Sequence, residues 1–390
     1  MSNASTPSRK YKIAYLIDGL SMGGAERLMV PILKYLSRAQ FDPYVCALQS
    51  KDGNPMADEI RALGVPVECL NIKHLRELNA IPRLMNYLKS IDADLVHTQL
   101  EAANILGNIS AKLLRLPGVC TIHVMPSLDV RAKTKLHQRV EWFTLRHFCD
   151  RVISVSEEAR QYHLKISGAA NGQVTTIYNG IDLSAFSDVD YAQERNRVRA
   201  ELGIPLDADV LVTVAVLRPP KGIQFLIRAM PAILDSHPNT YYLIVGSGSH
   251  REALMEEAGK SGVEERVVFA GMRKDVPQLL AASDIFVLPT LTEALPTVLA
   301  EAMAARLPLI ASQVGGIPEM ITNGQNGFLI EPEDVKGLAS ACIRLLENPD
   351  ERAAMGAEGW RIVNQKFSIE RQVEQLRDLY LQQLQAYGKS

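Results

Sequence analysis

The stretch "DIFVLPTLTEALPTVLAEAMAA", residues 284–305, carries two glutamates, Glu293 and Glu301, in an otherwise apolar segment. Its first part is short, apolar and contains an aromatic residue, which predicts a buried strand that ends near Pro289. The part that begins at Pro296 predicts a helix, because proline at the first helical position sacrifices no hydrogen bond. Glu293 then lies in the connecting loop, and Glu301 lies about one and a half turns into the helix.

This helix start has chemistry that suits a ligand. Leu295 precedes the proline and cannot cap the helix, so the N–H groups of Thr297 and Val298 stay open to an anion. The two carboxylates accept hydrogen bonds from hydroxyl groups. A ligand with an anionic group and several hydroxyls fits this arrangement. The alternative is structural: Glu293 caps the helix, and Glu301 is an ordinary exposed helix residue.

Similar strand–loop–helix units fill the whole chain. Continuous apolar strands joined by helices indicate parallel sheets covered on both faces. The expected strands fall into two series of about equal size, at 12–18, 44–49, 67–70, 95–99, 119–123, 151–156 and 174–179, and at 210–217, 241–246, 267–271, 285–289, 307–312 and 327–330. The fold class is therefore α/β, with two doubly wound, Rossmann-like parallel-sheet domains and ligands expected at the carboxyl ends of the strands, in a cleft.

The stretch "NGIDLSAFSDVD", residues 179–190, marks the boundary between the domains, because it is rich in turn residues and has no strong period. We expect a disordered tail at 1–9, a first domain at 10–180 and a second domain at 181–367. The stretch 368–390 predicts one long helix that packs back towards the first domain.

Composition excludes several classes of function. The net charge of −2 over 390 residues gives no electrostatic argument for nucleic-acid binding. The five cysteines are scattered and contain no CxxC pair, which predicts a reduced, cytoplasmic protein without structural zinc. The N-terminal segment has no apolar core of a secretory signal, and no apolar run is long enough to span a membrane.

Two loops carry residues suited to phosphate. In "IDGLSMGGAERLMV", residues 17–30, Gly23 and Gly24 stand at a helix start and allow a ligand to approach the backbone. In "VAVLRPPKG", residues 214–222, Arg218 and Lys221 follow a strand on a stiff loop and suit a diphosphate. Tight-turn geometry and solvated loop cations are the respective structural alternatives.

Weaker signals come from glycines and histidines at other strand ends. Gly246-x-Gly248 resembles a dinucleotide fingerprint, but Arg251 replaces the third glycine, so an NAD site is not favoured. His97 and His123 end strands of the first domain and could stabilise charge on a substrate, although lone histidines are more often structural.

Two further patterns favour structure over function. Asp-x-Asp pairs occur at 92–94, 188–190 and 207–209, and only the first adjoins a strand, at its entry, so a metal–diphosphate site there is not favoured. The basic stretch 129–148 could contact an anionic membrane surface or acceptor, but a solvated helix face is the favoured interpretation.

Taken together, these motifs resemble the GT-B nucleotide-sugar glycosyltransferases, specifically the retaining enzymes of glycosyltransferase family 4. The resemblance rests on "GGAER", "VLRPPKG", "IVGSG", "FAGMRKDV" and residues 282–321, which contain the Glu-x7-Glu element of the family. It covers nearly the whole chain and is strongest from 210 to 335.

The resemblance implies a role for each matching residue. Glu293 would contact the hydroxyls of the donor sugar, Glu301 the ribose, Lys221 the leaving diphosphate and His123 the transferred sugar. Further donor-binding positions are implied, at Gly23, Gly24, Gly246, Gly248, Gly271, Met272, Arg273, Ala294, Leu295, Pro296, Thr297 and Val298.

Two positions depart from the family pattern. Val216 stands where the family often has arginine, so Arg218 would have to supply the second cation, and Ala294 stands where glycine is frequent. The resemblance implies transfer with retention from a nucleoside-diphosphate sugar, a UDP-sugar being favoured, to a glycan or lipid-linked acceptor, without an obligatory metal or other cofactor. Such an enzyme would be cytoplasmic, with peripheral contact at the inner face of a membrane as an option. The alternatives are a nucleotide-sugar epimerase and a non-catalytic nucleotide-sugar-binding subunit.

Overall fold

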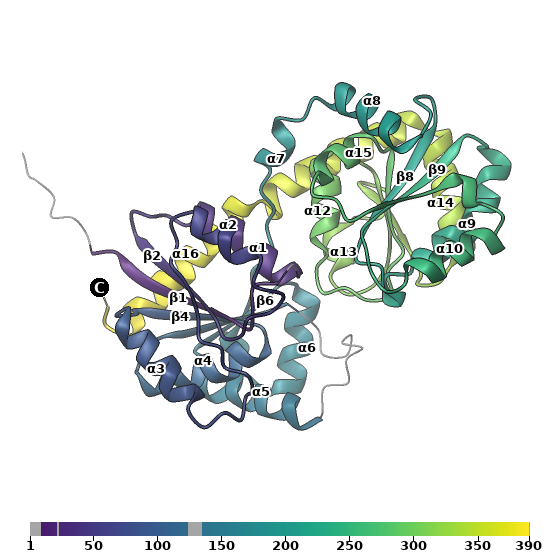
Figure 1. Ribbon diagram of the computed structural model, residues 1–390. Coiled ribbons are helices and arrows are strands. Elements are labelled where there is room, and N and C mark those ends of the chain that lie inside the picture. The colour runs from purple at the N-terminus through teal and green to yellow at the C-terminus, as the bar shows by residue number, and fades with distance from the viewer. Residues whose placement is uncertain (1–8, 22, 124–134, 390) are drawn as a thin grey trace, which may run out of the picture. The chain divides into compact units, whose positions relative to one another are not determined.

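The structure of the chain is a computed structural model that describes residues 9–21, 23–123 and 135–389, with the side chains of 135–138 excepted. It contains two compact units of similar size. The first unit runs to Gly180 and resumes at Ile369, and the second unit is Ile181–Ser368. Each unit is built on one parallel sheet covered by helices (Figure 1).

The sheet of the first unit has seven parallel strands in the order β3-β2-β1-β4-β5-β6-β7. The strands are β1 Tyr11–Ile17, β2 Phe41–Ala47, β3 Val67–Cys69, β4 Leu95–Gln99, β5 Gly118–Ile122, β6 Arg151–Ser154 and β7 Val174–Thr176. All seven strands that the sequence predicts are confirmed. The order reverses between β1 and β4, and this reversal is the switch point at which such sheets bind ligands.

Both faces of this sheet are apolar, as the continuous strands require. Ile13, Tyr15 and Ile17 of β1 pack with α1, α2 and α16, whereas Ala14 and Leu16 pack with α3 and α4 on the other face. The helices of the unit are α1 Gly24–Tyr35, α2 Met56–Ala62, α3 Ala80–Ser90, α4 Glu101–Leu113, α5 Lys135–Phe148, α6 Glu157–Ser167 and α16 Ile369–Ala386, with a 3-10 turn η2 at Asn171–Gln173.

The sheet of the second unit has six parallel strands in the order β10-β9-β8-β11-β12-β13, with its switch point between β8 and β11. The strands are β8 Asp209–Val214, β9 Thr240–Val245, β10 Val267–Gly271, β11 Ile285–Leu288, β12 Leu309–Ser312 and β13 Gly327–Ile330. These six predicted strands are also confirmed. The helices are α7 Ser184–Ser187, α8 Tyr191–Leu202, α9 Ile223–Ser236, α10 Arg251–Lys260, α11 Val276–Ala281, α12 Thr297–Ala304, α13 Ile317–Met320, α14 Val335–Glu347 and α15 Pro349–Lys366, with 3-10 turns η3 Pro219–Lys221 and η4 Glu264–Arg266.

The C-terminal helix α16 belongs to the core of the first unit. Its Tyr380 is fully buried, and the hydroxyl lies 2.5 Å from Nδ1 of His97 on β4 and 3.0 Å from the hydroxyl of Tyr15 on β1. Nε2 of His97 contacts the hydroxyl of Thr121 at 2.8 Å. The yellow helix in Figure 1 thus returns to the sheet formed by the purple and blue strands. A polar network inside an apolar core holds it in place.

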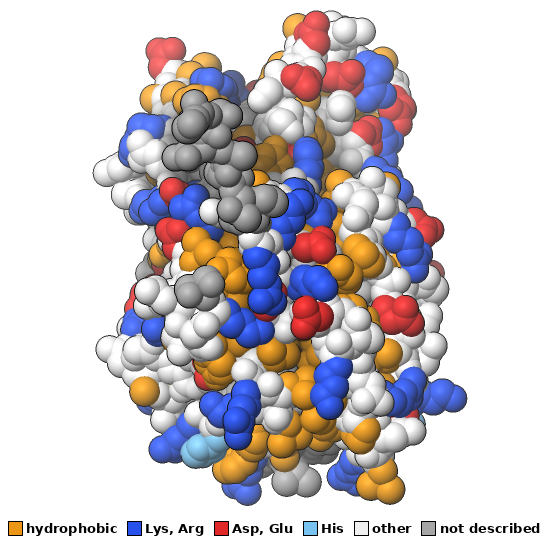
Figure 2. Space-filling model, turned by 90° about the vertical axis from the view of Figure 1, so that its left-hand side faces the viewer, with side chains coloured by type: hydrophobic (Ala, Val, Ile, Leu, Met, Phe, Trp, Pro, Cys, Tyr) orange, Lys and Arg blue, Asp and Glu red, His pale blue; other side chains and the backbone are white. Residues whose placement is uncertain are grey.

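The surface is mixed in character. On the face that Figure 2 shows, lysine and arginine side chains are interspersed with acidic and apolar ones, as a net charge of −2 suggests. None of the helices in the described part of the chain is long and apolar enough to cross a membrane. Residues 1–8 of the expected tail lie outside the described residues.

Candidate donor site and first-unit cavities

The loops after β8 and β11 meet at the switch point of the second sheet. The N–H of Leu291 donates to the carbonyl of Pro220 at 2.8 Å, and the hydroxyl of Thr290 donates to the same carbonyl at 3.1 Å. The β8 loop carries the predicted cations, and the β11 loop carries Glu293. The fold thus brings together two motifs that lie about 70 residues apart, as the carboxyl edge of a parallel sheet predicts.

An ion pair forms where the two loops meet. The ammonium group of Lys221 binds Oε1 of Glu293. Their side chains are 24% and 13% exposed, so both are partly shielded yet still open to a ligand. A partly buried pair holds each side chain in one place more firmly than an exposed pair does.

The start of α12 lies just beyond Glu293. The helix begins at Thr297, so Pro296 is its N-cap and not its first residue, a correction of one position. No side chain caps the helix among the described residues, which contradicts the alternative that Glu293 is the cap. Thr297 and Val298 are half-buried, and Leu295 packs into the core. This helix end therefore presents backbone N–H groups to a potential anion.

Two glycines fix the position of these loops. Gly315, with φ +54°, lies so close to the carbonyl of Glu293 that an added Cβ would collide with it. Gly222, with φ +67°, is packed in the same way against the carbonyl of Pro289. The N–H of Gly316 also donates to the carbonyl of Ala294 at 3.1 Å. The loop that bears Glu293 is therefore held from both sides by backbone contacts that no side chain could fit between.

The loops after β9 and β10 adjoin this edge. Gly246 and Gly248 pack against the carbonyls of Ala215 and Leu217, where an added Cβ would collide. The N–H of Gly246 donates to the carbonyl of Gly271 at 2.8 Å. Loop packing alone therefore accounts for both glycines of the dinucleotide-like motif.

The remaining predicted positions of the second unit differ in how exposed they are and in whether they form ion pairs. Met272 is 63% exposed. Arg273 is ion-paired with Asp275 and Glu201, and these two partners raise its pKa. Arg218 is exposed and forms no ion pair with the described residues, whereas Val216 exposes half of its side chain. Glu301 is half-buried on the second turn of α12.

In the first unit, the glycine pair stands at the start of α1 as predicted. Gly23 is the N-cap and Gly24 the first residue of the helix. The carboxylate of the buried Glu26 folds back so closely that Gly23 has no room for a Cβ, and it accepts a hydrogen bond from the hydroxyl of Ser21 at 2.7 Å. Gly24 is exposed with free space around its Cα. Only Gly24 is thus open to close approach, while Gly23 makes room for a local carboxylate.

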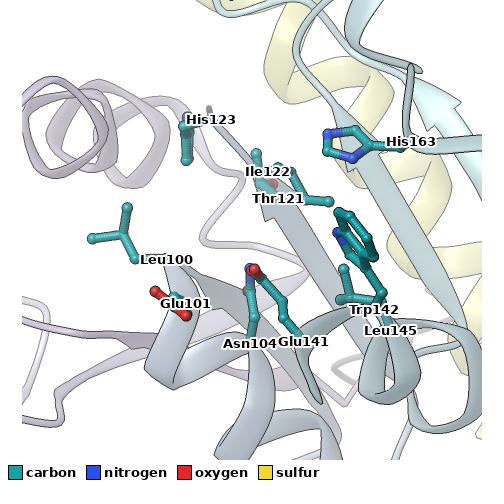
Figure 3. A pocket seen from close by; sticks show the side chains of 10 residues that line it. All are labelled: Leu100, Glu101, Asn104, Thr121, Ile122, His123, Glu141, Trp142, Leu145 and His163. Carbon is teal, nitrogen blue, oxygen red and sulfur yellow. The ribbon is translucent and has the colours of Figure 1, made fainter. Parts of the chain in front are cut away.

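His123 lines a cavity of about 60 Å³ at the carboxyl end of β5. Glu101 and His123 lie on one side of this cavity, and Trp142 and His163 lie on the other (Figure 3). Burial lowers the pKa of His123 to about 4, and its Nε2 lies 3.1 Å from Oε1 of Gln99. At neutral pH this imidazole is uncharged, so Nε2–H donates to the amide oxygen of Gln99, Nδ1 can accept a hydrogen bond, and the ring cannot supply a positive charge.

His163 is the most unusual residue of the same cavity. It is 2% exposed, and neither ring nitrogen has a hydrogen-bond partner among the described residues. Burial lowers its pKa to about 4. Leu100, which turns the chain from β4 into α4, has φ +71° and ψ 167°, a conformation nearly restricted to glycine. Unpaired polar groups and backbone strain of this kind collect at functional sites.

Several other predicted features are structural. His97 is a buried core residue with both nitrogens engaged, and burial lowers its pKa to about 3. Asp94 of the first Asp-x-Asp pair binds Arg9 at 2.8 Å and Lys389 at 3.0 Å, so it acts as an anchor for both chain ends. In the basic stretch 129–148, residues 129–134 lie outside the described residues, and the remainder forms α5.

The sequence alone did not identify some residues of the first unit. Glu101, Trp142 and His163 have no motif around them, because all three belong to helices that a sequence pattern marks only as amphipathic. Asp18 did carry a signal, since it ends the first strand next to a glycine. Its carboxylate accepts a hydrogen bond from the N–H of Ala103 at 2.8 Å and thereby caps α4.

Comparison with known proteins places the chain in a family. A model of the family described as Glycosyl transferases group 1 matches residues 194–361, and a model described as Glycosyltransferase Family 4 matches residues 22–185. Between them the two models cover most of both units. The chain therefore belongs to these glycosyltransferases, and the predicted family and GT-B fold are confirmed.

Several individual relatives have names that state their donor or their bound nucleotide. An Escherichia coli protein named UDP-Gal:alpha-D-GlcNAc-diphosphoundecaprenol alpha-1,3-galactosyltransferase is 27% identical over 95% of this chain and 97% of its own length. A GDP-mannose-dependent mannosyltransferase of Corynebacterium glutamicum that acts on a monoacylated phosphatidylinositol monomannoside is 34% identical over 56% of this chain and 60% of its own. The crystal structure of Anabaena HepE in complex with UDP superposes with a TM-score of 0.83, at 24% identity, over 95% of this chain and all of that one.

Proposed function

We propose that this glycosyltransferase moves a sugar from a UDP-sugar to a hydroxyl group of a glycan or lipid-linked acceptor, with retention of configuration and without an obligatory metal. The observation that carries this proposal is the Lys221–Glu293 pair beside the uncapped start of α12, at the switch point of the second sheet. A cation, a helix N-terminus and a carboxylate within one loop cluster match the diphosphate and the hydroxyls of such a donor.

The chemistry follows from the charge that develops in the reaction. The bond between the sugar C1 and the diphosphate oxygen breaks, and its electron pair goes to the diphosphate. The acceptor oxygen bonds to C1 on the same face, and its proton passes to the leaving phosphate oxygen. Lys221, Arg218 and the N–H groups of Thr297 and Val298 would stabilise the new negative charge, so a metal is not required.

The remaining groups would orient the donor. Glu293 would accept hydrogen bonds from the sugar hydroxyls, and Glu301 from the ribose. Gly271, Met272 and Arg273 would lie near the base. In the first unit, Gly24 would allow close approach to the phosphates, and Nδ1 of the uncharged His123 would accept a hydrogen bond from a hydroxyl of the transferred sugar, because Nε2–H already donates to Gln99.

Support for a UDP-sugar comes from the relatives. The relative that matches the chain over nearly its full length is named for UDP-Gal, and HepE was crystallised with UDP. The mannosyltransferase relative uses GDP-mannose but matches little more than half of the chain. We place the reaction in the cytoplasm, where the five free cysteines would stay reduced, and in the biosynthesis of a glycan, lipopolysaccharide or glycolipid.

The first test is thermal stabilisation of the pure protein by UDP, GDP, ADP and NAD, each with magnesium and with EDTA. A ligand at about 100 times its Kd adds about 2.7 kcal/mol to the free energy of unfolding. Of the four ligands, we expect only UDP to raise the Tm, and we expect the same increase with magnesium and with EDTA. Stabilisation by GDP alone would overturn the choice of base, and a strict need for magnesium would overturn the metal-independent mechanism.

Transfer itself is tested with the Glu293→Gln variant and with NMR of the product. We expect the variant to fold and bind UDP but to lose transfer, and we expect the product to keep the anomeric configuration of the donor. Conversion of the nucleotide sugar without any acceptor would indicate the epimerase alternative. Tight UDP-sugar binding without turnover on any acceptor would indicate the binding subunit.

A further inference from the structure

The switch point of the first sheet holds a cavity of about 550 Å³, a size typical of ligand sites. Asp18 lines it from the end of β1, Gln49 from the end of β2, and Glu101 from the start of α4. The wall formed by the loop after β3 is basic, with Lys73, His74 and Arg76. Strand ends on both sides of the switch point thus contribute to one cavity.

The basic loop is held in a fixed position. Leu75 packs against the core beneath it, and Nε2 of Gln49 donates to the carbonyl of Lys73 at 3.1 Å. The carboxylate of Glu77 accepts from the N–H of Lys73 at 3.1 Å and pairs with Arg83 at 2.8 Å. Glu77 therefore secures the backbone of the loop while its charge is balanced by a residue of α3.

The two cations of this loop have no acidic partner among the described residues. Among the described residues, the side chains of Lys73 and Arg76 form no ion pair, and both are exposed. Of the two carboxylates in the cavity, Asp18 is already hydrogen-bonded to the start of α4. Lys73 and Arg76 are therefore available to donate hydrogen bonds to an anion. Arg and Lys form strong charge-assisted hydrogen bonds with phosphate, so a phosphate group suits this cavity.

The neighbouring cavity provides a contrast. Glu101 lines both cavities, but the described lining of the smaller one contains neither lysine nor arginine. Its polar groups are two carboxylates, an amide, the hydroxyl of Thr121 and two uncharged histidines, beside the indole of Trp142 (Figure 3). Such a lining suits neutral hydroxyls and repels a phosphate. The two cavities therefore differ in the chemistry that each can accept.

We infer that the acceptor of this enzyme carries a phosphate or diphosphate group, and that Lys73 and Arg76 bind this group in the larger cavity. The inference rests on the proposed function, because it assigns the acceptor to the first unit. It places the neutral, hydroxyl-bearing part of the acceptor on the Glu101 side. The recognised chemistry is the phosphate of the acceptor molecule and not a membrane surface.

The test measures binding of glucose 1-phosphate to the full chain, with saturating UDP present to fill the donor site, and uses methyl α-glucoside as the uncharged probe. The cavity variant is Lys73→Ala with Arg76→Ala. The matched control is Lys89→Ala with Lys165→Ala, which removes two exposed cations of the same unit outside the cavity. Exposed substitutions of this kind leave folding nearly unchanged.

We expect the cavity variant to weaken glucose 1-phosphate at least about tenfold, the effect of one lost charge-assisted hydrogen bond. The control variant should bind as the wild type does, and UDP should raise the Tm of all three proteins equally. No loss in the cavity variant, or an equal loss in the control, would overturn the inference. A parallel loss of UDP binding would also overturn it, because the cavity would then hold the donor.

Two further outcomes separate the possible errors. If the cavity variant loses binding only to phosphatidylglycerol vesicles and keeps glucose 1-phosphate, the loop is a membrane contact and the inference is wrong. If the wild type does not bind UDP at all, the proposed function fails. Loss of glucose 1-phosphate in the cavity variant would still support the phosphate site in that case, so the two failures are distinguishable.

Discussion

Lys221 and Glu293, 72 residues apart in the chain, form an ion pair across the switch point of the second sheet. Each is the other's counter-charge, so neither charge is left uncompensated in a partly shielded place. When a donor binds, the ammonium group of Lys221 would pair with the diphosphate, and the carboxylate of Glu293 would accept hydrogen bonds from the sugar hydroxyls. Donor binding is then an exchange of partners, which costs less than bringing two hydrated ions out of water.

The first prediction concerns Lys221. We expect Lys221→Ala to lower kcat/KM about a hundredfold or more, since the loss of one preorganised charge-stabilising group costs about 3 kcal/mol. Steady-state kinetics with the UDP-sugar measures it. The matched control is Lys336→Ala on α14, an exposed lysine of the same unit, which should keep full activity. A Lys221→Ala enzyme with near-normal kcat/KM would remove this residue from the mechanism.

A second prediction uses a glycine pair. Gly315→Ala should displace the loop that bears Glu293, because Gly315 has a positive φ and its Cβ would collide with the carbonyl of Glu293. We expect a folded protein with transfer reduced at least about tenfold. Gly259→Ala, in the last turn of α10, meets no neighbouring atom and should retain activity with slightly higher stability. Equal activity of the two variants would contradict the tight fit described for this loop.

The C-terminal helix supports a third prediction. Tyr380→Phe removes the hydroxyl that serves both His97 and Tyr15, and leaves buried polar atoms unpaired. We expect the free energy of unfolding of the first unit to fall by about 1–3 kcal/mol. Urea unfolding followed by circular dichroism measures it. Tyr241→Phe is the control, because no described residue bonds its hydroxyl, and it should change stability by less than about 0.5 kcal/mol.

A fourth prediction concerns pH. Burial lowers the pKa of His97 to about 3 and of His163 to about 4, below the unfolded value of about 6.5. The unfolded state therefore binds more protons between pH 6.5 and 4, and the free energy of unfolding falls as the pH falls through this window. Each histidine contributes a slope of up to about 1.4 kcal/mol per pH unit.

The variant His163→Leu isolates one of these contributions. Its stability should depend less steeply on pH between 6 and 4.5, by up to about 1.4 kcal/mol per pH unit, because one titrating group is gone. Urea unfolding at a series of pH values measures the slope. An unchanged slope would mean that His163 is already protonated, or exposed, in the folded protein.

The strands were predictable because each is a short, continuously apolar run, and such a run predicts a strand that is buried on both faces. All thirteen appear, including the brief β3 and β7. The candidate donor loops were predictable for the same reason, because the carboxyl edge gathers whatever follows each strand. The strand orders, and with them the switch point of each sheet, were not predicted and come from the structure.

The contacts within the site could not be predicted from the sequence. The Lys221–Glu293 pair and the packing of Gly315 against Glu293 depend on side-chain and backbone approach between loops far apart in sequence. No local pattern encodes such distances. The basic loop at 73–76 was also missed, because two cations in a loop look like ordinary solvated residues until the switch point is known to lie beside them.

The place of α16 has a consequence for how the protein is made. The chain leaves the first unit at Gly180 and supplies its last helix only from Ile369 onward, whereas the second unit is one continuous segment. During synthesis, the second unit is therefore complete and able to fold while the first still lacks one of the three helices that pack on one face of its sheet. The unit made first is finished last, so the emergence of α16, and not the emergence of residue 180, determines when the first unit is complete.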